Sequence, residues 1–291
     1  MVAERSSGRL ANQKRSILRN KIVMANLTQK IVPVLGGKLS ITVNISGSGP
    51  PIFFCHSAGG FYWDDFLENL SKDYTIYAPY FPGTAPGKPD EIEQLEHLWD
   101  AVLAYDDAIE ELGLEQPIIM GHSFGGMLAA EIAAHRKNQT RKLILIAPIG
   151  LWKEEASYTV ANWCALSFPE MKEVLFHDQS CPRVIKRMAR PEEGTEEQAL
   201  WDRDFIWTIG CTAKLIWPIP DKGLCKRIHR ISAKSLIVWG ENDKLISPSY
   251  ANDFKHAIAD SQVFTLPLCG HEPPLEQTEK LEFAVRNFLS D

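Results

Sequence analysis

A serine bracketed by glycines in the middle of the chain is the feature that most constrains the fold. Residues 118–134 read IIMGHSFGGMLAAEIAA, so Gly121 and Gly125 lie two positions before and after Ser123. The short apolar run that precedes the serine predicts a buried strand, and the alanine-rich stretch that follows predicts a helix. A serine at the apex of so tight a strand-to-helix turn must take a strained backbone conformation, and flanking side chains would collide with it. The pattern therefore predicts a nucleophile elbow, which exposes the Ser123 hydroxyl at the end of a sheet.

Length and charge limit the classes of protein to which the chain can belong. Its 291 residues suffice for one large domain or for a domain with an insertion. The formal net charge of −6 argues against nucleic acid as the main partner. Residues 1–30 hold seven basic side chains and one acidic one, a net of +6, so the remainder carries −12. This basic head lacks a long apolar run and predicts neither a secretory signal nor a membrane span.

We expect residues 1–29 to form a disordered tail. An organelle-targeting segment and a gene start placed too early, with Met24 as the natural start, are the alternatives. The six cysteines include no C-x-x-C pair, which predicts reduced thiols in the cytoplasm and neither a disulfide framework nor a zinc site. Cys55 and Cys269 lie in apolar surroundings and are expected to be core thiols.

Short apolar runs alternate with helical patterns on both sides of a long middle segment. Strands are expected at 30–34, 39–45, 52–55, 74–78, 117–120, 142–147, 235–239 and 262–266. Helices are expected at 62–70, 91–112, 124–134, 248–259 and 274–289. This alternation predicts an α/β fold with a mostly parallel central sheet and helices on both faces, built from residues 30–149 and 232–291. Residues 150–231 break the alternation and hold five of the eight tryptophans, which predicts an inserted helical cap.

A serine hydroxyl becomes a good nucleophile only beside a base, and the base needs a carboxylate to orient it. In open α/β sheets, functional groups gather beyond the carboxyl ends of the strands. Asp243 follows the penultimate expected strand and His271 follows the last, so both are predicted to lie near Ser123. Glu241 and Asp253 compete with Asp243 for the role of the acid.

Four stretches of the expected core together resemble the α/β-hydrolase superfamily. HSAGG, GHSFGG, WGENDKLISP and CGHEPPLEQ are similar to its oxyanion loop, elbow, acid loop and histidine loop, in the order serine, aspartate, histidine. The resemblance implies that Ser123 is the nucleophile, that His271 is the general base and acid, and that Asp243 orients His271. It also implies an oxyanion hole formed by the backbone amides of Ala58 and Phe124. It implies no metal and no organic cofactor.

Two loops depart from the usual pattern of this superfamily. The oxyanion loop usually begins His-Gly, whereas here it reads His56-Ser57, which places an extra hydroxyl near the site. The loop after the fourth strand reads PYFPGTAPGKP and lacks the usual acidic residue. His56 is expected to order its loop, and His122 is expected to be structural, with its side chain pointing away from the Ser123 hydroxyl. Ser57 lacks an elbow and is a poor candidate nucleophile.

The resemblance implies hydrolysis of an ester or a lactone through an acyl-enzyme. Haloalkane dehalogenases and epoxide hydrolases of this fold carry aspartate where Ser123 stands. Carbon–carbon bond hydrolases, perhydrolases and acyl-homoserine lactone hydrolases share the serine triad and remain alternatives. A small-molecule receptor on a hydrolase scaffold is an alternative of a different class.

Residues 150–231 hold 12 basic and 12 acidic side chains and many aromatic ones. Such a neutral, aromatic roof predicts a small, uncharged, hydrophobic substrate. Ser57, Trp207 and Trp217 are the candidate pocket residues. The sequence leaves the oligomeric state open.

Overall fold

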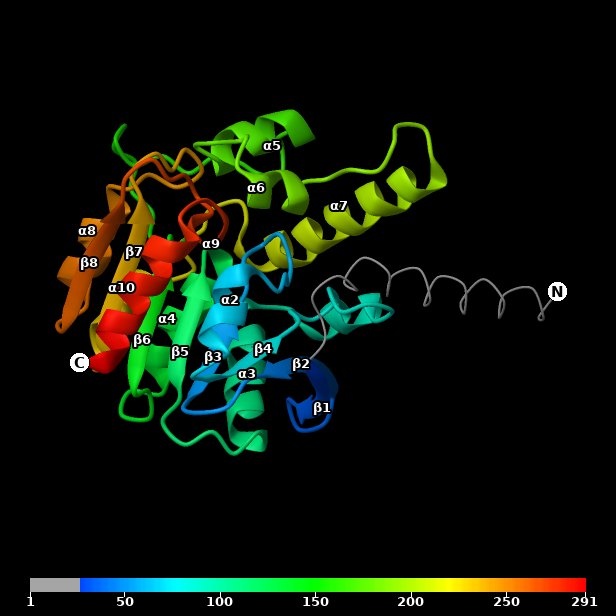
Figure 1. Ribbon diagram of the computed structural model, residues 1–291. Helices are drawn as coiled ribbons and strands as arrows, with labels where there is room; N and C mark the ends of the chain where they lie inside the picture. Colours follow the sequence, from blue (N-terminus) through cyan, green and yellow to red (C-terminus); the bar gives the residue numbers. More distant parts are fainter. Residues whose placement is uncertain (1–26) are drawn as a thin grey trace.

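The computed structural model describes residues 27–291, in which eight strands form one sheet with helices on both of its faces (Figure 1). The strands are β1 (Thr28–Val34), β2 (Leu39–Ser46), β3 (Pro51–Cys55), β4 (Thr75–Pro79), β5 (Ile118–His122), β6 (Lys142–Ile146), β7 (Lys234–Gly240) and β8 (Ser261–Leu266). Their order is β1-β2-β4-β3-β5-β6-β7-β8. β2 runs antiparallel to both of its neighbours, and all pairs from β4 to β8 are parallel. The predicted mostly parallel sheet is therefore confirmed.

Side chains that alternate along the strands build a hydrophobic cluster on each face of the sheet. On β6, Leu143 and Leu145 belong to one cluster, and Ile144 and Ile146 belong to the other. The first cluster packs under α3 (Leu98–Glu111), α4 (Phe124–His135) and α8 (Tyr250–Ala257). The second packs under α2 (Asp65–Leu70) and α10 (Thr278–Ser290), and the short α9 (Pro273–Glu276) precedes α10. The central strands are thus covered on both faces, as a parallel sheet requires.

A long segment between β6 and β7, residues 147–233, leaves the sheet and returns to it. We call it the β6–β7 insertion. It contains α5 (Phe168–Leu175), α6 (Pro182–Arg187), α7 (Glu196–Ile216) and two 3-10 helices, Leu224–Lys226 and Ile228–Arg230. In Figure 1 these helices lie beyond the carboxyl ends of the central strands, and α7 extends away from the sheet.

A hydrophobic cluster and an ion pair are among the contacts that fasten the insertion to the core. A small hydrophobic cluster joins Phe176, Val184 and Met188 of the insertion to Leu275 of α9. Near the return to β7, Arg227 donates hydrogen bonds of 2.7 and 2.6 Å to the fully buried carboxylate of Glu131 on α4. Because an unpaired buried carboxylate is costly, this ion pair fixes the end of the insertion against the helix that follows β5.

Several element boundaries differ from those predicted. The expected helix at 91–112 is divided into a 3-10 helix, Pro89–Gln94, and α3. Asp100 accepts hydrogen bonds from the amides of Glu96 and His97, which ends the first segment and starts a new helix. The expected tail is too long by two residues because β1 begins at Thr28. The prediction for residues 1–26 lies outside the described residues.

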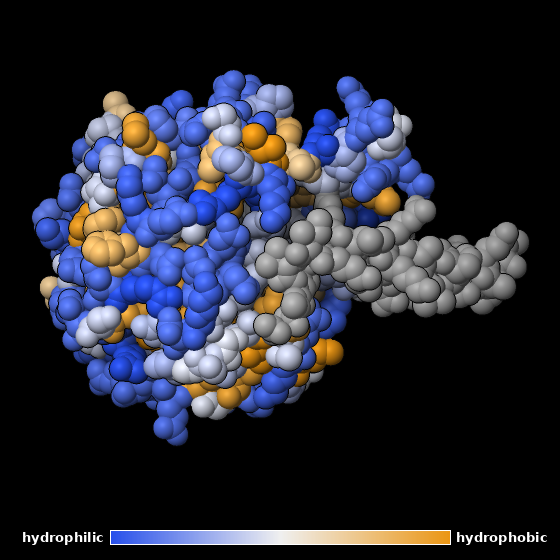
Figure 2. Space-filling model, in the orientation of Figure 1, coloured by the Kyte–Doolittle hydropathy of each residue, from blue (hydrophilic) through white to orange (hydrophobic). Residues whose placement is uncertain are grey.

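The helices and the visible surface of residues 27–291 can be described by their hydropathy. None of the helices there is both long and apolar enough to cross a bilayer. The face shown in Figure 2 is mostly hydrophilic, with separate small hydrophobic areas. Scattered exposed apolar side chains of this kind are normal on a folded protein.

Candidate active site

The turn between β5 and α4 has the strained geometry predicted for Ser123. Its backbone lies at φ 56° and ψ −116°, a region that residues other than glycine rarely adopt. A Cβ atom at Gly121 would approach the carbonyl oxygen of Gly125 to 2.1 Å, and one at Gly125 would approach the carbonyl oxygen of Cys55 to 2.0 Å. No side chain fits at either position, so the two glycines let the first turn of α4 pack directly on the backbone around them. The strain is the reason that the hydroxyl faces the pocket.

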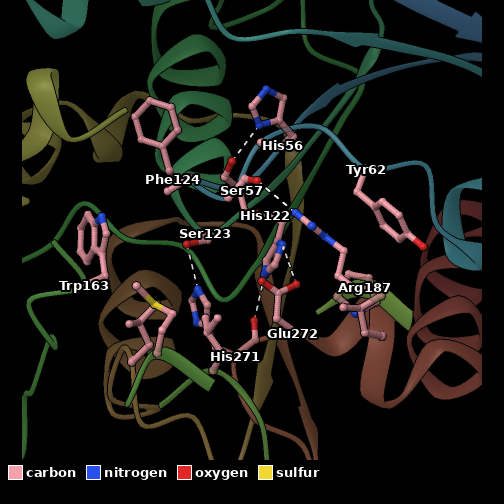
Figure 3. A pocket seen from close by; sticks show the side chains of 18 of the residues that line it. His56, Ser57, Tyr62, His122, Ser123, Phe124, Trp163, Arg187, His271 and Glu272 are labelled. Carbon is pink, nitrogen blue, oxygen red and sulfur yellow. Dashed lines mark hydrogen bonds and ion pairs between the residues drawn. The ribbon is translucent and has the colours of Figure 1, made fainter. Parts of the chain in front are cut away.

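Three residues from three different loops meet at this turn, and Figure 3 shows two of them, Ser123 and His271. The Ser123 Oγ lies 2.8 Å from Nε2 of His271, and Nδ1 of His271 lies 2.7 Å from Oδ2 of Asp243. All three side chains are buried. Because an ionised carboxylate only accepts hydrogen bonds, Nδ1 carries the ring proton and Nε2 is left to accept the hydrogen of the Ser123 hydroxyl. This is the arrangement of a nucleophile, a base and an orienting acid.

Asp243 is held in place by groups of its own loop and strand. Its Oδ1 accepts hydrogen bonds of 2.9 Å from the amides of Leu245 and Ile246, and its Oδ2 accepts one of 3.1 Å from the indole of Trp239. These donors satisfy a buried carboxylate that would otherwise be costly. Of the two competing acids, Glu241 is exposed and Asp253 pairs with Lys153, so neither meets His271.

The pKa of His271 reflects two opposing effects. Burial lowers it, but the charge of Asp243 and its hydrogen bond outweigh burial, and the pKa lies above its ordinary value. A more basic imidazole is a better acceptor for the proton of a serine hydroxyl, and its protonated form is stabilised by the same carboxylate. The electrostatics of the site thus favour transfer of a proton from Ser123 to His271.

Two residues whose backbone amides are candidate donors line the pocket, Ala58 in the loop after β3 and Phe124 at the start of α4. Within the described residues, neither the amide of Ala58 nor that of Phe124 donates a hydrogen bond to the protein, and both residues line the pocket. His56 orders this loop, as expected. Its Nδ1–H donates to the carbonyl of Ser57 at 2.7 Å, and its Nε2 accepts from the amide of Phe81 at 2.9 Å. Burial lowers the pKa of His56 to about 4, so the ring is neutral at pH 7.

His122 supports the histidine loop. Its Nε2 lies 2.8 Å from the carbonyl oxygen of His271, to which it donates, and its Nδ1 faces the carboxylate of Glu272 at 3.9 Å (Figure 3). It makes no hydrogen bond with Ser123, which agrees with the expected structural role. It nevertheless lines the pocket, where the centre of its ring lies 5.4 Å from that of His271.

The serine lies at the bottom of a pocket between the sheet and the β6–β7 insertion. Its empty space amounts to about 980 Å³, including the part open to solvent. Most of the wall is apolar, and the insertion supplies much of it. The apolar residues from the insertion are Ile149, Trp163, Met171, Leu175, Phe176, Met188, Phe205 and Ile209. Such a wall suits the hydrophobic part of a substrate.

One side of the pocket is charged, although the sequence pattern predicted a neutral wall. Arg187, Asp64 and Glu272 all line it. Arg187 donates a hydrogen bond of 3.0 Å to the carbonyl of Gly59, and its guanidinium lies 5.0 Å from the centre of the Tyr62 ring. Burial, together with the charge of Glu272, raises the pKa of Asp64 to about 7. Of these three charged residues, only Glu272 could have been expected near the site from the sequence, because it directly follows His271.

The expected wall residues Trp207 and Trp217 do not line the pocket, whereas Ser57 does. Trp207 is 47% exposed and donates its indole N–H to the carbonyl of Gly83 at 2.9 Å. Trp217 packs edge-on against Trp163, with ring centres 5.1 Å apart, and it is Trp163 that faces the pocket. Neither tryptophan therefore lies on the wall of this pocket, because the direction of each side chain depends on packing that sequence spacing does not show.

Comparison with known proteins supports this description. The sequence profile of the alpha/beta hydrolase family matches residues 52–284. The chain is 23% identical to a 2-hydroxy-6-oxo-6-phenylhexa-2,4-dienoate hydrolase of Burkholderia cepacia, over 91% of this chain and 97% of that protein. It is 22% identical to a pimeloyl-acyl-carrier-protein methyl ester esterase of Vibrio cholerae, over 83% and 97%.

Solved structures resemble the fold at lower sequence identity. A membrane phospholipase A described as a bacterial virulence factor matches with a TM-score of 0.72 at 19% identity, over 99% of this chain and 95% of that one. A meta-cleavage product hydrolase from Pseudomonas fluorescens IP01 matches with a TM-score of 0.67 at 17% identity, over 90% and 97%.

Proposed function

Because the chain belongs to the alpha/beta hydrolase family, we propose that it is a serine hydrolase that cleaves a carboxylic ester or a lactone through an acyl-enzyme. Ser123 Oγ attacks the carbonyl carbon while Nε2 of His271 takes the hydroxyl proton. The amides of Ala58 and Phe124 stabilise the oxyanion. His271 then gives the proton to the departing alcohol. Water, activated by the same imidazole, hydrolyses the acyl-enzyme and restores the serine.

The observation that carries this proposal is the hydrogen-bonded chain Ser123–His271–Asp243, with contacts of 2.8 and 2.7 Å, at a backbone position held under strain. Strain of this kind persists only where the surrounding structure fixes it, and it concentrates at functional sites. A structural serine in a turn would need neither a positive φ nor a buried imidazole beside it.

A fluorophosphonate probe tests the proposed nucleophile. We expect covalent labelling at Ser123, mapped by mass spectrometry of peptides, and no labelling of the Ser123→Ala variant. The purified protein should also hydrolyse nitrophenyl esters. An adduct at another residue would contradict the mechanism. Tight binding of a ligand without labelling and without turnover would favour a receptor built on this scaffold.

The apolar wall supports a substrate with a hydrophobic acyl or aryl group, since its burial is worth about 25 cal/mol per Å². The charged side of the pocket favours a polar group elsewhere on the same substrate. Arg187 has a single hydrogen bond to the protein, through one of its five N–H groups, and no ion pair within the described residues. A polar or anionic group on the substrate fits this side better than a second hydrocarbon chain does.

A second candidate activity is hydrolysis of a carbon–carbon bond beside a ketone. Two relatives that cover most of this chain are named as hydrolases of dienoates, which are carboxylates, and Arg187 offers a cation in the pocket. Parallel assays of neutral nitrophenyl esters and a 2-hydroxy-6-oxo-dienoate distinguish the two activities. A kcat/KM that is higher for the dienoate and falls in Arg187→Met would favour carbon–carbon cleavage. A preference for neutral esters that this variant leaves unchanged would favour ester hydrolysis.

We infer a reducing compartment for the protein, in agreement with the cytoplasmic location expected from the sequence. All six cysteines are free, and burial raises the pKa of Cys55 and Cys269 above the ordinary value, which makes both thiols inert.

A further inference from the structure

The carboxylate of Glu276, at the end of α9, bridges the β6–β7 insertion and the histidine loop. Its Oε1 accepts hydrogen bonds from the amides of His177 at 2.7 Å and Asp178 at 3.0 Å, both in the insertion just after α5. Its Oε2 accepts one of 2.7 Å from the amide of Gly270, the residue before His271. One side chain thus binds two separate backbone segments. Hydrogen bonds to a charged acceptor of this kind are stronger than those between neutral groups.

A direct backbone contact reinforces this bridge. The amide of His271 donates to the carbonyl of Leu175, the last residue of α5, at 2.7 Å. A Cβ atom at Gly270 would approach that same carbonyl oxygen to 2.5 Å and the amide nitrogen of His177 to 2.8 Å, so only glycine allows the two segments to lie this close. The main chain of His271 is therefore held from the insertion side, whereas its ring is held from the sheet side by Asp243.

The segment that holds His271 is also part of the substrate wall. Leu175 and Phe176 both line the pocket. Phe176 packs in the small cluster with Leu275, the neighbour of Glu276 in sequence. A substrate group that presses on this wall therefore contacts the same short stretch of chain whose carbonyl and amides are joined to the histidine loop.

We propose that Glu276 is a positioning residue that couples the pocket wall at Leu175 and Phe176 to the base His271, so that a substrate that fills the pocket orders the base for proton transfer. The inference rests on the proposed function. If Glu276 has this role, the insertion contributes to the rate of proton transfer as well as to the shape of the pocket. Misplacement of a catalytic group by about 1 Å costs up to about 100-fold in rate, which sets the size of the effect.

Glu276→Gln tests this coupling with little change in shape. The glutamine side chain carries an NH2 donor where glutamate has a second acceptor oxygen. Either the amide of Gly270 or the amides of His177 and Asp178 therefore lose their acceptor. We expect kcat on a medium-chain nitrophenyl ester to fall by about 10- to 100-fold, with KM for the acetate ester unchanged. The preference for the longer ester over the acetate should shrink, because filling the wall no longer orders the base.

Glu279→Gln is the matched control. Glu279 also joins the insertion to the core, through an ion pair with Arg183 of α6, but it is exposed and touches no part of the histidine loop. We expect this variant to stay within about twofold of the unmodified protein, as is usual for an exposed pair. Equal losses in both variants would show that any contact of the insertion matters, and would overturn the specific role of Glu276.

A second measurement needs no variant and covers the case in which Glu276→Gln does not fold. Amide hydrogen exchange at His271 is followed in the unmodified protein after reaction with a methyl or a medium-chain phosphonate. Slower exchange with the longer group supports the coupling, and equal exchange overturns it. If the unmodified protein does not react with phosphonates, the proposed function itself fails. If it reacts and Glu276→Gln reacts at the same rate, only the coupling fails.

Discussion

The sheet side and the insertion side of the pocket are held in place by different interactions. On the sheet side, Ser123 directly follows β5, and Asp243 and His271 lie in the loops after β7 and β8. Backbone hydrogen bonds along the sheet set where these strands end. On the insertion side, Trp163 lies outside any helix or strand and Phe205 lies on α7, and side-chain packing sets the direction of both rings. The sheet side supplies the hydrogen-bonded chain of Ser123, His271 and Asp243, and the insertion side supplies most of the apolar wall. The two sides meet at His271, whose amide donates to the carbonyl of Leu175 in the insertion.

The largest expected effect is on the sheet side. Ser123→Ala removes the nucleophile and should lower kcat by about 10⁶-fold. The fold should persist, because the glycines that flank the turn remain. Ester turnover and thermal unfolding are measured on the same preparation. If substantial turnover remains, a second nucleophile such as Ser57 must act, and the sheet side is not the sole source of reactivity.

Asp243→Asn should have the next largest effect. The asparagine side chain no longer fixes the tautomer of His271 that accepts the serine proton, and kcat should fall by up to about 10⁴-fold. The shape of the loop should be kept because the amide oxygen still accepts hydrogen bonds from Leu245 and Ile246. A loss below about tenfold in steady-state assays would mean that another carboxylate serves as the acid.

On the insertion side, the expected effect is on selectivity. Trp163→Ala enlarges the pocket wall and should change the relative kcat/KM among acyl lengths by about 10-fold or more, with a small effect on the acetate ester. Trp207→Ala is the control, because this tryptophan is half exposed and packs outside the pocket. Equal changes in both variants across a chain-length series would refute the assignment of the wall to Trp163.

The smallest expected effect is a shift in pH dependence. His271 must be unprotonated to accept the serine proton, so the rate of phosphonate labelling should fall as the pH drops through an apparent pKa above the ordinary value of 6.5. Asp243→Asn removes the charge that raises this pKa and leaves the burial that lowers it. The apparent pKa of labelling should therefore move to lower pH in that variant. An unchanged midpoint would show that a group other than the His271 and Asp243 pair controls the reaction.

The sequence predicted the sheet and the meeting of Ser123, Asp243 and His271, because both depend on local rules. Gly121 and Gly125 specify the turn, and the positions of Asp243 and His271 follow from where strands end. The same rules failed for Trp207 and Trp217, since neither strand alternation nor a turn motif fixes the direction of an irregular insertion. They also gave no signal for Arg187, whose place in the pocket depends on its contacts with Gly59 and Tyr62.

The pairing of β6 with β7 has a consequence for how this protein tolerates change. The two strands are neighbours in the sheet, matched from Lys142 opposite Lys234 to Ile146 opposite Val238, although the whole insertion separates them in the chain. The entropic cost of closing a loop grows only slowly with its length, by about 0.6 kcal/mol for each doubling. Loop closure therefore sets only a weak limit on the length of chain between these strands. The stronger limit is packing, because Trp163, Leu215 and Ile228 of the insertion belong to the buried core and the carbonyl of Leu175 accepts the hydrogen bond of the His271 amide. A replacement segment that keeps these contacts would change the pocket wall and leave Ser123, Asp243 and His271 in place.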